Sequence, residues 1–129
     1  MFGAYNVQTA TVFLAYDPAA NEDYIIFVAP KALEIKGVKA TVTNTVAAST
    51  ANYFDLALYN GGATAGTALG VVAGTLLGTA GWVALTPNSF TVTNGTMAAN
   101  EVLKLRYSET GTGTFGSMLL SIDYVLGVG

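Results

Sequence analysis

The chain has no cysteine and no histidine among its 129 residues. Without cysteine it has neither a disulfide framework nor thiolate chemistry. Without histidine it lacks the commonest general base and the commonest transition-metal ligand. Charged residues make up only 10% of the chain, against about 25% in an average soluble protein. These absences favour a binding or assembly role over catalysis.

The few charges are also unevenly placed. The five basic residues are scattered, so the sequence has no Lys and Arg cluster of the kind that nucleic acid requires. The 45 residues between Asp55 and Glu101 carry no charge at all. A surface with so few charges is poorly suited to a soluble monomer. We therefore expect a homo-oligomer, covered by copies of itself or by another protein.

Apolar and polar residues alternate most regularly near the C-terminus, from Glu101 to Leu126. A period of two is typical of a strand with one buried face. The two alternating runs flank a linker of glycines and threonines, which suits a hairpin loop. We predict that the runs pair as a hairpin near the middle of a sheet, with Leu105 and Ile122 facing each other in the core.

The remaining strand signals are shorter. Gly37 shifts the phase of its run and predicts a bulge. The run Tyr24–Val28 is continuously apolar, which predicts a strand covered on both faces. Helix signals are almost absent. Strands are predicted in residues 8–16, 23–29, 33–46, 52–60 and 89–93, with turn residues between them. The pattern predicts an all-β sandwich of about seven to nine antiparallel strands.

Residues 1–8 show no period of two, and we interpret them as an N-terminal arm before a single domain of residues 9–129. Phe2 and Tyr5 are aromatic side chains that water does not favour leaving exposed. An arm of this kind can order on a neighbouring molecule, and a frayed terminus is the alternative. The candidate interface residues are Phe2, Tyr5, Val7 and Trp82. The first residues also lack the basic region and continuous apolar core of a signal peptide, so export by that route is not expected.

Glycines recur every fourth residue at Gly66, Gly70, Gly74 and Gly78. Such spacing in an apolar segment is typical of packed transmembrane helices. However, threonines and alanines dilute the segment, and no Lys or Arg flanks it to set an orientation. We favour a glycine-rich strand and loop, with no membrane partner.

The acidic residues give little support for an enzyme. Most of the eight lie at turns or on the polar face of a strand, where water solvates them, and only Asp55 and Asp123 are in mid-strand, where they could meet across a sheet. The cluster Asn21–Asp23 is too short for a calcium loop. We therefore expect no catalytic, metal or cofactor site.

The seven tyrosines and Trp82 are the basis of an alternative function. Together they could form a platform on which sugar rings stack, which would make the chain a carbohydrate-binding β-sandwich module. Tyrosine is, however, more typical of sheet surfaces and subunit interfaces.

Four segments follow one another in the order seen in a known family. They read KALEIKGVKATVTNTV (31–46), YFDLALYNGG (53–62), FTVTNGTMAANEVLKLRY (90–107) and GTGTFGSMLLSIDYVLG (111–127). This order resembles the capsid decoration, or cement, proteins of tailed phages, over about three quarters of the chain. The resemblance implies a jelly-roll-like sandwich, often a trimer, that binds the major capsid protein on the outside of an icosahedral head. It also implies assembly in the host cytoplasm and a structural rather than enzymatic role.

Overall fold

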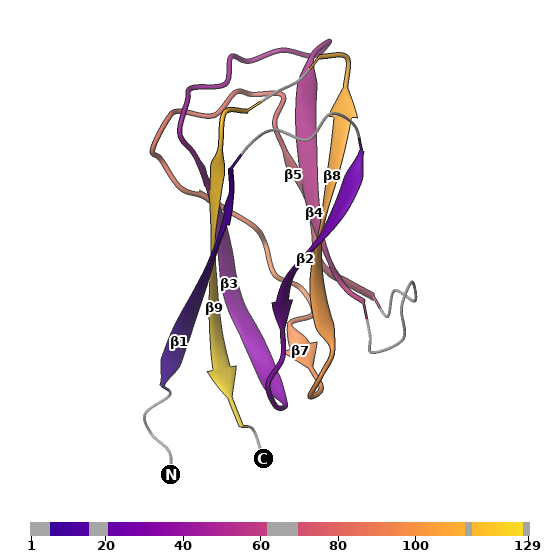
Figure 1. The fold of residues 1–129 in the computed structure, drawn as a ribbon. Helices are drawn as coiled ribbons and strands as arrows, with labels where there is room; N and C mark the ends of the chain where they lie inside the picture. The colour runs from indigo at the N-terminus through magenta and orange to yellow at the C-terminus, as the bar shows by residue number, and fades with distance from the viewer. Residues whose placement is uncertain (1–5, 16–20, 62–69, 113–114, 128–129) are drawn as a thin grey trace.

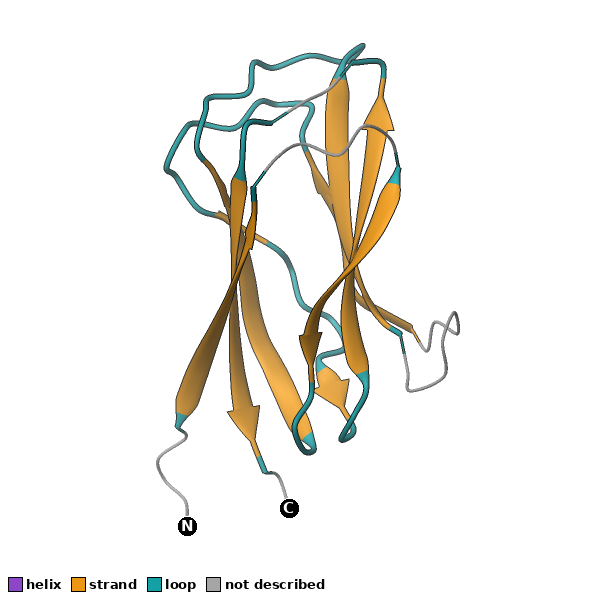
Figure 2. Cartoon of the chain, in the orientation of Figure 1, coloured by secondary structure: helices purple, strands orange, loops and turns teal. Residues whose placement is uncertain are grey.

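The computed structural model describes residues 6–15, 21–61, 70–112 and 115–127, and these residues form nine strands and no helix (Figures 1 and 2). The expected all-β fold and strand number are confirmed. The strands are β1 (Val7–Leu14), β2 (Glu22–Val28), β3 (Leu33–Val42), β4 (Tyr53–Asn60), β5 (Gly70–Leu77), β6 (Asn88–Ser89), β7 (Thr96–Met97), β8 (Val102–Thr110) and β9 (Met118–Leu126).

The strands form two antiparallel sheets that face each other (Figure 1). The first sheet has the order β1-β9-β3-β6, and β7 also pairs with β3. The second sheet has the order β2-β8-β4-β5. Strands that follow one another in sequence mostly lie in opposite sheets, and only the connections β4–β5 and β6–β7 stay within one sheet. This alternation is the two-sheet jelly roll, which confirms the jelly-roll-like sandwich.

The predicted C-terminal hairpin is wrong. β8 lies in the second sheet and β9 in the first, so the two strands do not pair with each other. The connection crosses between the sheets, and the buried ring of Phe115 packs near Phe54 and Tyr107, with ring centroids 5.3 and 5.8 Å away. Alternation gives each strand one apolar face. That face is buried equally well whether the two strands pair in one sheet or lie in two sheets that face each other across a core.

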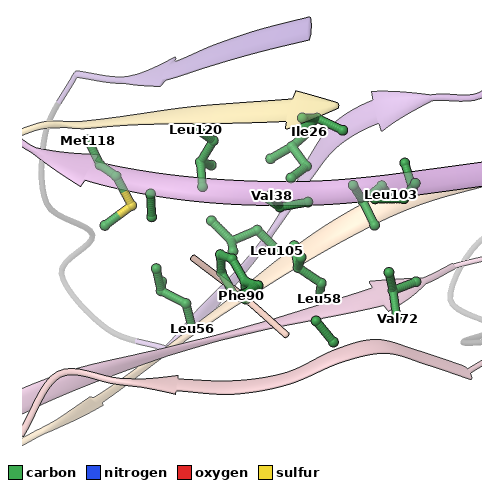
Figure 3. Packing of buried hydrophobic residues seen from close by; sticks show 14 of the residues in the cluster. Ile26, Val38, Leu56, Leu58, Val72, Phe90, Leu103, Leu105, Met118 and Leu120 are labelled. Carbon is green, nitrogen blue, oxygen red and sulfur yellow. The ribbon is translucent and has the colours of Figure 1, made fainter. Parts of the chain in front are cut away.

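The core lies between the central strands of the two sheets. Leu105 of β8 and Ile122 of β9 are completely buried, as predicted, but they belong to opposite sheets rather than to the two arms of one hairpin. Figure 3 shows side chains from both sheets converging, including Leu56, Leu105 and Leu120. This burial is the main source of stability, at about 25 cal/mol for each Å² of apolar surface removed from water.

Two predictions about β2 and β3 have different outcomes. The bulge at Gly37 is confirmed, because the register of β3 against β9 shifts between Ile35 and Gly37. By contrast, β2 is not covered on both faces. It is an edge strand, and Ile25 and Val28 are 67% and 51% exposed. Its continuous apolar run arises from a bulge between Ile25 and Phe27, which changes the face of the residues that follow.

The glycine-rich segment contributes the strand β5, as favoured from the sequence. No helix among the described residues is long and apolar enough to cross a membrane. The arm boundary at residue 8 is wrong, because Val7 and Gln8 already belong to β1 and pair with Val125 and Tyr124.

Candidate interaction surfaces

Of the four candidate interface residues, the structure describes Val7 and Trp82. Phe2 and Tyr5 lie outside the described residues. Val7 is 56% exposed at the start of β1. Trp82 is only 4% exposed, its ring lies 5.0 Å from that of Phe54, and its indole N–H donates a hydrogen bond to the carbonyl of Leu77 at 3.2 Å. The assignment of Trp82 to an interface is therefore corrected, because its side chain is part of the core.

One side of the sandwich is closed by the chain itself. Residues 88–97 pass from β3 to β5, with the N–H of Phe90 bonded to the carbonyl of Val38 at 2.9 Å and the N–H of Thr93 bonded to that of Val72 at 2.8 Å. An isolated bridge also joins Val92 to Ala73. The apolar side chains at this side are consequently well covered.

The opposite side, formed by β1 and β2, is less completely covered. Ile26 of β2 is buried, but the other inward-facing side chains of these two strands are only partly buried, although they pack against the core. The rings of Phe27 and Tyr124 meet here at 4.9 Å, which joins the second sheet to the first. The partly buried side chains are Ala10, Val12 and Leu14 of β1 and Tyr24 and Phe27 of β2. This β1–β2 side is the first candidate interaction surface.

A second apolar surface lies at the end of the first sheet where β1 finishes. Phe13 and Leu119 are directly opposite each other in the register, and they are 58% and 39% exposed. In the loop beside β3, Val83 and Leu85 are 64% and 74% exposed, and the N–H of Leu85 bonds to the carbonyl of Val42. Leu85 also has a φ of 61°, which is unfavourable for a leucine. Backbone strain of this kind clusters at functional sites.

The sequence contains a signal for the exposed positions of Phe13 and Leu119. Phe13 lies between Val12 and Leu14, and Leu119 lies between Met118 and Leu120. In an alternating strand, an apolar residue out of phase with the core-facing ones must lie on the outer face. Leu85 carried no comparable signal, because its loop has no period.

The outer face of the second sheet carries a small charged cluster. The guanidinium of Arg106 on β8 donates two hydrogen bonds to the carboxylate of Asp23 on β2, at 2.9 and 3.3 Å, and lies 4.7 Å above the ring of Tyr59 on β4. These hydrogen bonds hold the pKa of Asp23 below its ordinary value of 3.8 and raise that of Arg106. A shallow, open hollow of about 330 Å³ lies beside the pair. Among the described residues, no three acidic side chains gather as metal ligands.

Asp23→Asn should lower the free energy of unfolding at neutral pH by at most about 1 kcal/mol, because both partners are exposed and water screens the pair. The pKa of Asp23 is depressed by folding, so its contribution is present above pH 3.8 and is lost as the pH falls through the lower pKa of the folded state. Urea unfolding of both proteins at pH 7, 5 and 3 checks this. A difference that persists unchanged at pH 3 would contradict the assignment.

The expected meeting of Asp55 and Asp123 does not occur, because they lie in opposite sheets. Asp123 accepts a hydrogen bond from the hydroxyl of Thr9 at 2.7 Å, and Asp55 accepts one from the N–H of Gly78 at 3.4 Å. Both carboxylates therefore have structural partners on a neighbouring strand or turn.

The aromatic side chains do not assemble into a stacking platform within the described part of the chain. Tyr107 and Trp82 are buried, and Tyr24 and Tyr124 are half-buried at the β1–β2 side. Tyr59 is on an outer face, but Arg106 covers its ring. Tyr5 and Tyr16 lie outside the described residues, and the described ones give no support to the carbohydrate-binding alternative.

No protein-family model and no curated protein sequence matches the chain. Among solved structures, it is similar to a chain in the capsid of Ralstonia phage GP4, with a TM-score of 0.65 and 12% identity over 100% of this chain and 90% of that one. It is also similar to a chain in the capsid asymmetric unit of cyanophage Pam1, with a TM-score of 0.61 and 13% identity over 98% of this chain and 89% of that one. At these identities the likeness shows a shared fold. The fold is one that occurs in phage capsid structures.

Proposed function

We propose that the chain is a structural virion protein that binds the outside of an icosahedral phage head and stabilises the capsid lattice. The observation that carries this proposal is the fold, which matches chains of two phage capsid structures over nearly their whole length. The match includes both sheets, so it is not a likeness of one motif. The order of segments that resembles decoration proteins supports the same conclusion from the sequence.

The surface properties fit such a role. Large apolar side chains are exposed at Phe13, Val83 and Leu85, whereas charged side chains are scarce. Exposed apolar surface of this kind is suited to contact with another protein. The major capsid protein is the proposed partner, and the described residues offer no cluster of metal ligands that would suggest chemistry instead.

The physical action would be mass action on the lattice. A protein that binds only the assembled shell stabilises the shell by its own binding free energy. Assembly in the host cytoplasm and self-association as a homo-oligomer belong to the same proposal. A trimer is the number that the family resemblance implies, and the mass of the free protein checks it.

The direct experiment uses heads of the phage that encodes this chain, prepared without it. The purified protein is added, the heads are sedimented, and the bound fraction and the melting temperature of the heads are measured. We expect saturable binding and a higher melting temperature of the heads. Failure to bind intact heads would contradict the proposal.

The arm hypothesis predicts that deleting residues 1–5 weakens head binding without unfolding the domain. The deletion ends before β1, so the paired residues from Val7 onward are kept. We expect the melting temperature of the free protein to change by only a few degrees, and occupancy on heads to fall sharply. Unchanged occupancy would identify the segment as a frayed end, and loss of the folded domain would show it to be structural.

A further inference from the structure

β1 is an edge strand that, within the described residues, lacks the usual protection against pairing. It is the outermost strand of the first sheet, and its eight residues pair with β9 in one continuous register without a bulge (Figure 1). Its sequence, VQTATVFL, contains no charge and no proline. Edge strands are normally protected by charges, proline, bulges, short length or a covering segment, because their free backbone groups pair readily with another strand.

The other four edge strands do carry such protection. β2 has a bulge and the acidic residues Glu22 and Asp23. β6 and β7 have only two residues each. The register of β5 against β4 is interrupted twice, and residues 92–94 bond to its outer side. β1 is thus the long, regular and uncharged edge among the strands of the described part of the chain.

We propose that β1 pairs antiparallel with β1 of a second copy of this chain, about a twofold axis through Ala10. The strand is complementary to itself in this register. On the outer face, Val7 comes opposite Phe13 of the second copy, and Thr9 comes opposite Thr11. Val7 and Phe13 are 56% and 58% exposed in the single chain, so each covers the other. No charged side chain of β1 approaches its own copy across the axis.

The inner face of β1 supports the same occupant. Ala10, Val12 and Leu14 are only partly buried against the core. A second β1 continues the sheet and brings its own Ala10 and Val12 to this inner face, which extends apolar cover over the β1–β2 side. The paired sheet then has the order β6-β3-β9-β1 followed by the same strands of the second copy in reverse.

A contact between identical surfaces closes at two chains. The β1 contact therefore predicts a free protein with an even number of chains, whereas the family resemblance implies a trimer. The inference does not depend on the proposed function, because it concerns copies in solution without any phage head. Loss of head binding and loss of β1 pairing are measured on different samples and are separately visible.

The test places a lysine on this edge. Thr11→Lys adds a charge to an exposed position of β1 and brings two lysines close together across the axis. Ser89→Lys is the matched control, because it adds the same charge to the exposed β6 at the opposite edge of the same sheet. Mass is measured by light scattering and sedimentation at micromolar concentration, and thermal melting checks that each variant is folded.

We expect the wild type and the Ser89→Lys variant to contain an even number of chains. The Thr11→Lys variant should have half their mass. A monomeric or trimeric wild type, or a folded Thr11→Lys variant of unchanged mass, overturns the proposal.

A second measurement covers the case in which Thr11→Lys does not fold. Because the chain has no cysteine, Ala10→Cys gives it a single thiol. A short thiol-reactive cross-linker should join two such chains in high yield, because Ala10 faces its own copy on the axis. Lys39→Cys, on the exposed face of the interior strand β3, should join few. Equal yields from the two variants overturn the proposal.

Discussion

Leu105→Ala should lower the free energy of unfolding by about 2–5 kcal/mol, and Ile122→Ala by a similar amount. Both side chains are completely buried, and they belong to the middle strands of opposite sheets. Each truncation removes buried apolar atoms and leaves a cavity that the surrounding strands cannot fully close. The loss is a large share of a typical domain stability of about 5–15 kcal/mol.

The measurement is urea or thermal unfolding of each variant beside the wild type. For a domain of this size, the expected loss lowers the melting temperature by at least about 6 °C. Leu119→Ala is the control, because Leu119 lies on β9 but is 39% exposed on the outer face. Leu119→Ala should lower the free energy of unfolding by less than about 1 kcal/mol. Similar losses for Leu105 and Leu119 would mean that the faces of β8 and β9 are assigned wrongly.

Side-chain alternation proved to be a dependable guide to which face is buried. It placed Leu105 and Ile122 in the core, and both are completely buried. A period of two follows from the geometry of one strand, so local sequence is sufficient to recognise it. The bulge at Gly37 was equally local and equally visible.

Strand pairing was less accessible, because it depends on contacts between distant parts of the chain. The alternation in β8 and β9 is the same whether they pair or face each other. The pairing of β9 with β1 and β3 joins residues more than 70 positions apart. The jelly-roll order came from the resemblance to a family, not from the period of the strands.

The candidate surfaces were predicted least well. Trp82 looked available because its segment has no charge, yet it is buried against Phe54. Phe13 was visible only as an apolar residue out of phase. The unprotected edge at β1 depends on the strand order, because a strand is an edge only in relation to its neighbours.

Gly95→Ala should lower the free energy of unfolding by about 1–3 kcal/mol, the usual cost of forcing extra atoms into a packed site. A Cβ added at Gly95 would lie 2.3 Å from the carbonyl oxygen of Ile35, which is backbone and cannot turn aside. Glycine is therefore needed at residue 95 for this close approach. The N–H of Ile35 also bonds to the carbonyl of Gly95 at 2.8 Å, beside the bulge of β3.

Gly37→Ala is the matched control for this change. Gly37 is on β3, two residues from Ile35, and a Cβ built there has no atom within 4 Å. The same substitution should therefore be neutral, or stabilising by up to about 1 kcal/mol through the reduced freedom of the unfolded chain. Unfolding in urea of both variants and the wild type measures the difference. If residue 95 approaches β3 this closely, Gly95→Ala must be less stable than Gly37→Ala. A Gly37→Ala variant that is the less stable of the two would contradict this close approach.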